Sequence, residues 1–414
     1  MELLTQLIDL MKSEILLVKG PASVKVKSGE VSVLGLPLKI NQVVVVRKNK
    51  VLPFELINDS SIIITLGENG DYSVEQGNVG TKIWDSVVNR VFMNKTLPRK
   101  VILIGETDSG KSTLATYLIN LALSKGLRVG IVDGDVGQND LGPPGSVCAK
   151  IVEKPIFDLR DLSADRLNFI GVTSPRYKMV ENILMNSLSD LVNDISRVVD
   201  LCIINTDGYV SEGGIEYKLN LVNNLKPDLI IYLKSIEGEF ELYKRLIEYL
   251  SLDKVMVAER SKKFVKSRSE RIERRVSQYH KFLRDSKRIK INLNSLKLNF
   301  LGNIYSENQI ISEGLMKIGS NGSLIINQSM SENVIKIQDN YKIVLMSRAS
   351  LQGMFIALGI KDCVKGFGII QRVFPNFDTN ILTPIEDEFD LIFLSLINLA
   401  PNLREEYIIP IVFS

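Results

Sequence analysis

The sequence contains one histidine, one tryptophan and three cysteines among its 414 residues. A single histidine, His280, makes a histidine base or a histidine-rich metal site unexpected. The cysteines Cys148, Cys202 and Cys363 lie far apart and form no C-x-x-C pair, which argues against a disulfide framework and a zinc knuckle. We expect Trp84 to pack at a domain junction. The cysteine pattern favours a reducing compartment.

Long apolar runs are also lacking, since none approaches the ~18 residues of a membrane-spanning helix. Charged residues at positions 9, 12 and 14 interrupt the apolar stretch near the N-terminus. We therefore expect no signal peptide and no membrane partner, and a cytoplasmic location, or a nuclear one if the source is a eukaryote.

Positive charge is concentrated in one segment. The net charge of the chain is only +3, yet residues 260–290 hold thirteen Lys or Arg and three Asp or Glu. A basic cluster of this kind indicates an anionic ligand held at one place.

The pattern along the chain changes twice, and the length is suited to two or three domains. Residues 1–95 consist of short β-rich runs and predict an N-terminal β domain. Residues 96–290 alternate strands with helices, which predicts a doubly wound parallel sheet. Residues 291–414 are β-rich again and predict a C-terminal β domain. The expected fold class is α/β, with a central P-loop NTPase sheet between two small β domains.

The most informative motif is G-E-T-D-S-G-K-S at residues 105–112, which matches the phosphate-binding pattern G-x-x-x-x-G-K-[ST]. An apolar strand candidate at 101–104 precedes it and a predicted helix at 113–125 follows it. Backbone N–H groups of such a loop bind phosphates at the helix N-terminus. The alternative is an ordinary Gly-rich turn. The predicted nucleotide-binding residues are Gly105, Glu106, Thr107, Asp108, Ser109, Gly110, Lys111, Ser112 and Thr113.

Within this loop, Lys111 would reach the β- and γ-phosphates and Ser112 would bind Mg²⁺. Such a site also needs an acid at the end of a neighbouring strand. Asp133 and Asp135 follow the strand candidate 128–132, and alternation places both on one side of an extended segment. One could act on metal-bound water and the other could accept a proton. The alternative is that one of them caps a turn.

Two further strand ends carry candidate binding residues. In Asn205–Tyr209, the amides and the Thr206 hydroxyl could hold a second phosphate or the acceptor, and Tyr209 could stack on a base. The alternative is a plain turn with a half-buried tyrosine. Residues 171–175 form a similar turn with the same alternative.

The basic segment carries arginines at helical spacing. Arg268 and Arg271 are three residues apart and Arg275 is four further on, so they share a helix face. Arginine suits multidentate phosphate contacts, and arginines that stabilise transferring phosphate recur in phosphoryl transfer. The alternative is a solvated charged helix.

Taken together, these motifs resemble those of the polynucleotide 5′-hydroxyl kinase family. That family includes the kinase subunit of the eukaryotic pre-mRNA cleavage and tRNA-splicing machinery, the ribosomal-RNA-processing kinases and archaeal counterparts; the compact flanking domains resemble the archaeal members. The resembling segments are Thr107–Ser112 (T-D-x-G-K-[ST]), Asp135–Gln138 (D-x-G-Q), Thr173–Pro175, Asn205–Tyr209 (N-T-x-G-[WY]), and Glu259–Lys262 with Arg268–Ile272 (the arginine lid).

The resemblance implies Mg²⁺-dependent transfer of the γ-phosphate of ATP or another NTP to the 5′-hydroxyl of RNA or DNA, with RNA-processing proteins as possible partners. It gives catalytic roles to Lys111, Asp135, Arg268 and Arg271, and metal binding to Ser112 and Asp135. The residues expected at the acceptor are Asp133, Gln138, Thr173, Thr206, Gly208 and Tyr209.

Two other functions remain open from the sequence. One is a non-catalytic ATP-binding assembly factor of an RNA-processing complex. The other is a small-molecule kinase or an NTPase switch. A GTPase would be expected to carry an N-K-x-D motif, and the Asn-Lys at 94–95 lacks the Asp.

Overall fold

The computed structural model describes residues 4–77, 79–93, 96–211, 213–234, 241–260, 267–311, 314–330, 332, 334–338 and 342–413. Two lid residues quoted above, Ser261 and Lys262, lie outside these ranges, as do Asn94 and Lys95. The chain divides into two compact units. The first comprises Met1–Asp135, Ala149–Asp165 and Leu188–Glu270, and the second Val136–Cys148, Arg166–Ser187 and Arg271–Ser414.

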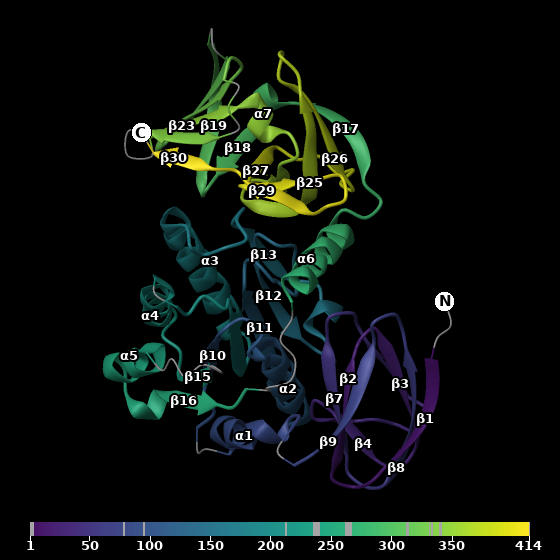
Figure 1. Cartoon of the computed structure of the whole chain (residues 1–414). Coiled ribbons are helices and arrows are strands. Elements are labelled where there is room, and N and C mark those ends of the chain that lie inside the picture. Colours follow the sequence, from purple (N-terminus) through teal and green to yellow (C-terminus); the bar gives the residue numbers. More distant parts are fainter. Residues whose placement is uncertain are drawn as a thin grey trace. The chain divides into compact units, whose positions relative to one another are not determined.

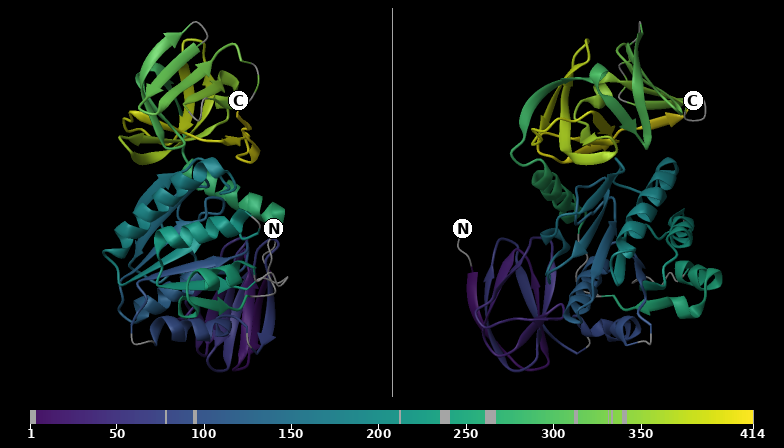
Figure 2. Two further views of the ribbon diagram at one scale, coloured as in Figure 1. Left: turned by 90° about the vertical axis from the view of Figure 1, so that its left-hand side faces the viewer. Right: turned by 180° about the vertical axis from the view of Figure 1, so that it is seen from behind.

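Within the first unit, the N-terminal residues form two antiparallel sheets, drawn in purple in Figures 1 and 2. Their strand orders are β1-β8-β3-β6 and β5-β4-β7-β2-β9. Alternation places Val24 and Val26 in the core, as expected for strands with one buried face. The strands are β1 (Leu4–Leu10), β2 (Glu14–Lys19), β3 (Ala22–Ser28), β4 (Val31–Val33), β5 (Leu36–Pro37), β6 (Val43–Val46), β7 (Val51–Leu56), β8 (Ser60–Leu66) and β9 (Asp71–Gln76).

A seven-stranded sheet follows in the chain, with the order β13-β12-β11-β14-β10-β15-β16. β10 pairs in parallel with β14 and β15, and the pairs β11–β14 and β15–β16 are parallel too. The strands are β10 (Lys100–Gly105), β11 (Val129–Gly134), β12 (Ser146–Val152), β13 (Arg166–Phe169), β14 (Leu201–Thr206), β15 (Leu229–Leu233) and β16 (Val255–Ala258).

Helices alternate with these strands, as the sequence predicts. They are η1 (Lys82–Trp84), α1 (Asp85–Phe92), α2 (Lys111–Ser124), η2 (Leu159–Asp161), α3 (Lys178–Ser196), α4 (Gly213–Leu225), α5 (Glu241–Tyr249) and η3 (Leu252–Lys254). Because β14 and β15 lie on opposite sides of β10, the strand order reverses there. Ligands bind at such a reversal, outside the carboxyl ends of the strands, which is where β10 enters the phosphate loop.

The second unit contains most of the C-terminal residues. A twelve-stranded sheet has the order β17-β26-β25-β24-β27-β18-β19-β20-β21-β23-β22-β30, and β28 pairs with β29. The elements are α6 (Arg268–Phe282), η4 (Leu293–Ser295), α7 (Arg348–Leu351), β17 (Lys287–Asn292), β18 (Lys297–Phe300), β19 (Asn303–Ile311), β20 (Gly314–Gly319), β21 (Gly322–Asn327), β22 (Ile335–Gln338), β23 (Ile343–Ser347), β24 (Phe355–Ile360), β25 (Cys363–Val373), β26 (Asp378–Thr383), β27 (Leu391–Leu394), β28 (Ile397–Leu399), β29 (Glu405–Ile408) and β30 (Ile411–Phe413).

An aromatic cluster forms part of the core of the second unit. Tyr279 of α6 packs edge-on against Phe355, which stacks on Phe367 with ring centroids 5.6 Å apart. Aromatic pairs of this kind contribute beyond their buried area. They fix the C-terminal half of α6 to the β structure that follows it.

The α/β fold class with flanking β domains is confirmed. The three-domain division at residues 95/96 and 290/291 stays a prediction. Nowhere in the described ranges is a helix both long and apolar enough to cross a membrane.

Candidate active site

The phosphate loop connects β10 to α2. Gly110 has a φ of +103°, a left-handed conformation that favours glycine. It is also the N-cap of α2, and having no side chain it leaves that helix without a side-chain cap. A phosphate can therefore occupy the position that a capping oxygen has in other helices.

Lys111, the first residue of α2, has a buried side chain. Its ammonium donates to the carbonyl oxygens of Gly105 at 2.7 Å and Glu106 at 2.6 Å. Burial lowers the pKa of Lys111 to about 8, although the nearby carboxylate of Asp135 acts in the opposite direction. The Lys111 ammonium is thus a buried positive charge beneath the phosphate loop.

Trp84 and Arg260 lie close to the loop. Trp84 is buried, and its ring would lie 3.5 Å from a Cβ placed on Gly110. The Arg260 guanidinium donates to a Glu106 carboxylate oxygen at 2.9 Å. Its Nε is buried and meets no hydrogen-bond partner within the described ranges. Arg260 thus brings a second positive charge to the first variable position of the loop.

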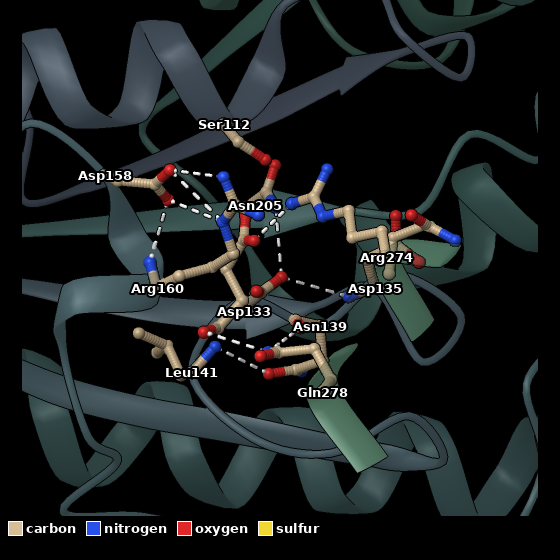
Figure 3. A network of polar contacts seen from close by, with 12 residues as sticks. Ser112, Asp133, Asp135, Asn139, Leu141, Asp158, Arg160, Asn205, Arg274 and Gln278 are labelled. Atoms are coloured by element: carbon tan, nitrogen blue, oxygen red, sulfur yellow. Dashed lines mark hydrogen bonds and ion pairs between the residues drawn. The ribbon is translucent and has the colours of Figure 1, made fainter. Parts of the chain in front are cut away.

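Asp133 and Asp135 lie at the carboxyl end of β11. The buried Asp133 carboxylate accepts from Asn205 Nδ2 at 3.0 Å and from the backbone N–H of Asp135 at 3.3 Å (Figure 3). The bond to the Asp135 N–H is that of a turn, which was the alternative for one of the two acids. Asp135 is partly exposed, so it is the better placed of the two to meet a ligand.

The residues around Asp135 suit a magnesium site completed by a nucleotide. No group of three or more His, Cys, Asp or Glu side chains that could hold a metal occurs in the described part of the chain. Mg²⁺ commonly uses one or two protein ligands together with water and substrate phosphates, so Ser112 and Asp135 fit such a site. The buried Asn205 Oδ1, which accepts from no described residue, could receive a hydrogen bond from a metal-bound water.

The clasp turn, which we define as Thr206–Tyr209, packs directly on the phosphate loop. A Cβ on Gly208 would lie 2.2 Å from Thr107 Oγ1 and 2.4 Å from Thr107 N. The Thr206 hydroxyl donates to the Leu103 carbonyl oxygen at 2.8 Å, so its proton is not directed at an acceptor phosphate. Tyr209 is half-buried, with its ring centroid 6.3 Å from that of Tyr217.

The arginine helix α6 begins with a capping box. Ser267 N–H donates to the Glu270 carboxylate at 2.7 Å, and Glu270 N–H donates to Ser267 Oγ at 3.1 Å. Two N-terminal residues hold the same turn: the Lys19 ammonium lies 3.1 Å from the Glu270 carboxylate, and Asn49 Nδ2 donates to the Glu270 carbonyl at 3.2 Å. Arg268 is exposed on this anchored first turn.

The remaining predicted site residues, Gln138, Thr173 and Arg271, belong to the second unit. Gln138 Nε2 donates to the Arg271 carbonyl at 3.5 Å, and Thr173 is half-buried. The structure therefore brings the phosphate loop, both acids and the clasp turn together in the first unit. Gln138, Thr173 and Arg271 are parts of the other unit, so they are described apart from that site.

Two arginines of α6 are bound to acids within the second unit. Arg274 forms an ion pair with Asp140, and Arg275 lies 2.9 Å from Glu405. Gln278 donates to the Asn139 carbonyl at 2.9 Å (Figure 3). These contacts fix α6 to the segment after the D-x-G-Q motif and to β29. His280 is exposed on the same helix.

Sequence reasoning missed three residues near the loop. Arg260 was quoted within a motif but given no role, and Asp207 and Lys218 were not singled out as site residues. Lys218 is fully buried and its ammonium lies 3.0 Å from the Asp207 carboxylate. No local pattern distinguishes a buried lysine in a helix from an exposed one. The S-x-x-E spacing at Ser267–Glu270, in contrast, is a local pattern that predicts the start of a helix.

Comparisons with known proteins agree with this geometry. Residues 105–285 match the model of the mRNA cleavage and polyadenylation factor CLP1 P-loop. A solved structure of the wild-type Clp1p–Pcf11p complex has a TM-score of 0.69 and 14% identity, and the match covers 95% of this chain and 98% of that one. At this identity the likeness establishes the fold.

Two archaeal relatives cover most of the chain. A polyribonucleotide 5′-hydroxyl-kinase of Pyrococcus abyssi is 32% identical over 70% of this chain and 84% of its own length. A polyribonucleotide 5′-hydroxyl-kinase of Methanocaldococcus jannaschii is 30% identical over 70% of this chain and 83% of its own. The chain therefore belongs to the family of the archaeal polyribonucleotide 5′-hydroxyl-kinases.

Proposed function

We propose that this protein is a polynucleotide kinase that moves the γ-phosphate of ATP, or another NTP, to the 5′-hydroxyl of RNA or DNA. The observation that supports it best is the contact between the phosphate loop and the clasp turn, with Asp135 at the neighbouring strand end. This arrangement puts a nucleotide phosphate site, an acid and an acceptor turn at one edge of a sheet. The archaeal relatives, which are polyribonucleotide 5′-hydroxyl-kinases, agree with this proposal.

In this proposal, Lys111 and the loop amides bind the β- and γ-phosphates. Binding would transfer the Lys111 ammonium from the carbonyls of Gly105 and Glu106 to phosphate oxygens. Both partners of the bonds so formed are charged, so coulombic attraction would make them stronger than the bonds to neutral carbonyls. The ammonium would stabilise the charge that develops on the transferring group.

Ser112 and Asp135 would hold Mg²⁺, which would neutralise phosphate charge when bound. Asp135 would also orient the 5′-hydroxyl and accept its proton, while Asp133, held by Asn205, would keep the turn in place. Arg268 and Arg271 would stabilise the transferring phosphoryl. Gln138, Thr173, Gly208 and Tyr209 would position the acceptor, and Thr206 would do so through its bond to β10.

Phosphoryl transfer of this kind needs little covalent chemistry from the protein. Its transition state is loose, so positioning and charge stabilisation supply most of the acceleration. A buried lysine and a fixed acid at the end of a rigid sheet are suited to both. We also propose that the protein acts in the cytoplasm and binds RNA-processing proteins.

The test is transfer of labelled γ-phosphate from ATP to a short RNA and a matched DNA, each with a 5′-hydroxyl, with Mg²⁺ and with EDTA. The variants are Lys111→Ala and Asp135→Ala, and Lys125→Ala removes an exposed lysine just after α2 as a control. Label that requires Mg²⁺, is lost in both site variants and persists in the control would support the kinase. ATP binding without transfer in the wild type would favour the assembly-factor alternative.

A further inference from the structure

Asp207 is a buried carboxylate at the centre of the clasp turn, with several partners. Its Oδ1 accepts from the Tyr209 N–H at 2.8 Å, and its Oδ2 accepts from the Tyr217 hydroxyl at 3.0 Å. The Lys218 ammonium lies 3.0 Å from both Oδ2 and the Asp207 carbonyl oxygen. Thus a single lysine bonds the side chain and the backbone of the same turn residue.

Lys218 is an unusual source for these bonds, because its side chain is 0% exposed. Burying an ammonium is costly unless it is paired and hydrogen-bonded. In agreement, burial lowers the pKa of Lys218, while Asp207 acts in the opposite direction. The pair therefore keeps two charges out of water at this place, although an apolar contact there would have a smaller desolvation cost.

The helix that carries Lys218 also contacts the clasp turn through its first turn. A Cβ on Gly214 of α4 would lie 2.6 Å from the Tyr209 carbonyl oxygen, so α4 and Tyr209 are in close contact. On its other side, the clasp turn meets Thr107 at Gly208. The turn is thus held between a helix and the phosphate loop.

We propose that Lys218 is a positioning residue for the kinase reaction, which acts through Asp207 to hold the clasp turn against the phosphate loop. The inference rests on the proposed function for its effect on catalysis. Its structural part, that the buried pair fixes the turn, does not depend on that function. Lys218 touches neither the nucleotide nor the acceptor in this account.

A double-mutant cycle tests the pair. Lys218→Met removes the ammonium and keeps an unbranched side chain, and Asp207→Asn removes the carboxylate charge. The double variant removes both charges and keeps an oxygen that can accept from Tyr209. Lys226→Met is the matched control, since this exposed lysine directly follows α4.

The first measurement is hydrogen exchange of the amides at 206–209 in the absence of substrates. We expect at least tenfold faster exchange in each single variant, partial recovery in the double variant, and wild-type exchange in Lys226→Met. Equal exchange in all proteins would overturn the inference. The inference would also be overturned if the acceleration of exchange in the double variant equalled the product of the two single accelerations, because Lys218 would then act independently of Asp207.

The second measurement separates positioning from a general loss of structure. We expect kcat/KM for the RNA acceptor to fall at least tenfold in each single variant, while the Kd of ATP changes less than threefold. Parallel loss of ATP affinity and turnover would overturn the positioning role. If Lys218→Met does not fold, comparing Asp207→Asn with the double variant still shows whether the Lys218 ammonium has an effect once the Asp207 carboxylate is gone; a large further loss would overturn the inference.

Failure of the proposed function gives a different result. The wild type would then bind ATP and transfer no phosphate, while hydrogen exchange would still report on the turn. Faster exchange in the single variants would in that case support the structural part and reject the catalytic one.

Discussion

The substitution Gly208→Ala tests the contact between the clasp turn and the phosphate loop. The added Cβ would lie 2.2 Å from Thr107 Oγ1, 2.4 Å from Thr107 N and 2.7 Å from Thr107 Cα. The first atom belongs to a side chain that can rotate, but the other two are loop backbone. Relief therefore requires the turn and the loop to separate, which displaces the phosphate site relative to the acceptor.

Overpacking of this kind costs about 1–3 kcal/mol. If the active arrangement bears the whole cost, kcat/KM falls by roughly 5- to 150-fold, since about 1.4 kcal/mol corresponds to a factor of ten. Both substrates should be affected, because Thr107 is part of the nucleotide loop. This differs from the Lys218→Met variant, in which the Kd of ATP is expected to stay nearly constant.

The assay is steady-state transfer of labelled phosphate to RNA, with ATP and RNA varied in turn. Gly126→Ala is the control: Gly126 has a φ of +73°, and a Cβ there would meet nothing within 4 Å. The control should lose some stability from backbone strain and keep its kcat/KM. Wild-type kcat/KM in a folded Gly208→Ala protein would refute the reasoning.

Two further predictions concern charge. The pKa of Lys111 in the folded protein is about 8, below its ordinary value of 10.5. Between these two pH values the unfolded state therefore binds more protons than the folded state. The free energy of unfolding of the wild type, relative to that of Lys111→Met, should rise from about pH 8 to about pH 10.5. Urea denaturation without nucleotide measures this difference, and a difference that does not change with pH would contradict it. Arg274→Ala should cost about 3–5 kcal/mol of stability, because it removes the cation paired with the buried Asp140 carboxylate. Arg284→Ala, at an 82% exposed side chain, is the control, and equal unfolding curves for the two variants would contradict the prediction.

The order of elements around the phosphate loop could be predicted from local pattern. The apolar run before Gly105 and the helix after Gly110 are short-range features, and the predicted strand at 101–104 lies within β10. β1 cannot be recognised from its local pattern, although its register with β8 is regular. Its leucines at positions 4, 7 and 10 have a spacing typical of a helix, and pairing with β8 overrides it.

The contacts that complete the site could not be predicted, because they join residues far apart in the sequence. Gly208 meets Thr107, and Asn205 bonds Asp133, only after parallel strands have brought their carboxyl ends to one edge. Likewise, β12 follows a segment rich in glycine and proline, which reads as a loop although the strand after it is largely buried. The two contacts and strand β12 all depend on the pairing of strands in the sheet.

The capping turn of α6 has a consequence for how this protein can change over evolution or by design. Glu270, next to Arg271, is held by Lys19 and Asn49. A chimera that exchanges the N-terminal sheets for those of a relative would therefore release the start of the arginine helix unless both contacts were carried over. A domain with no residue in the phosphate loop would then behave in such a graft as part of the enzyme's catalytic machinery.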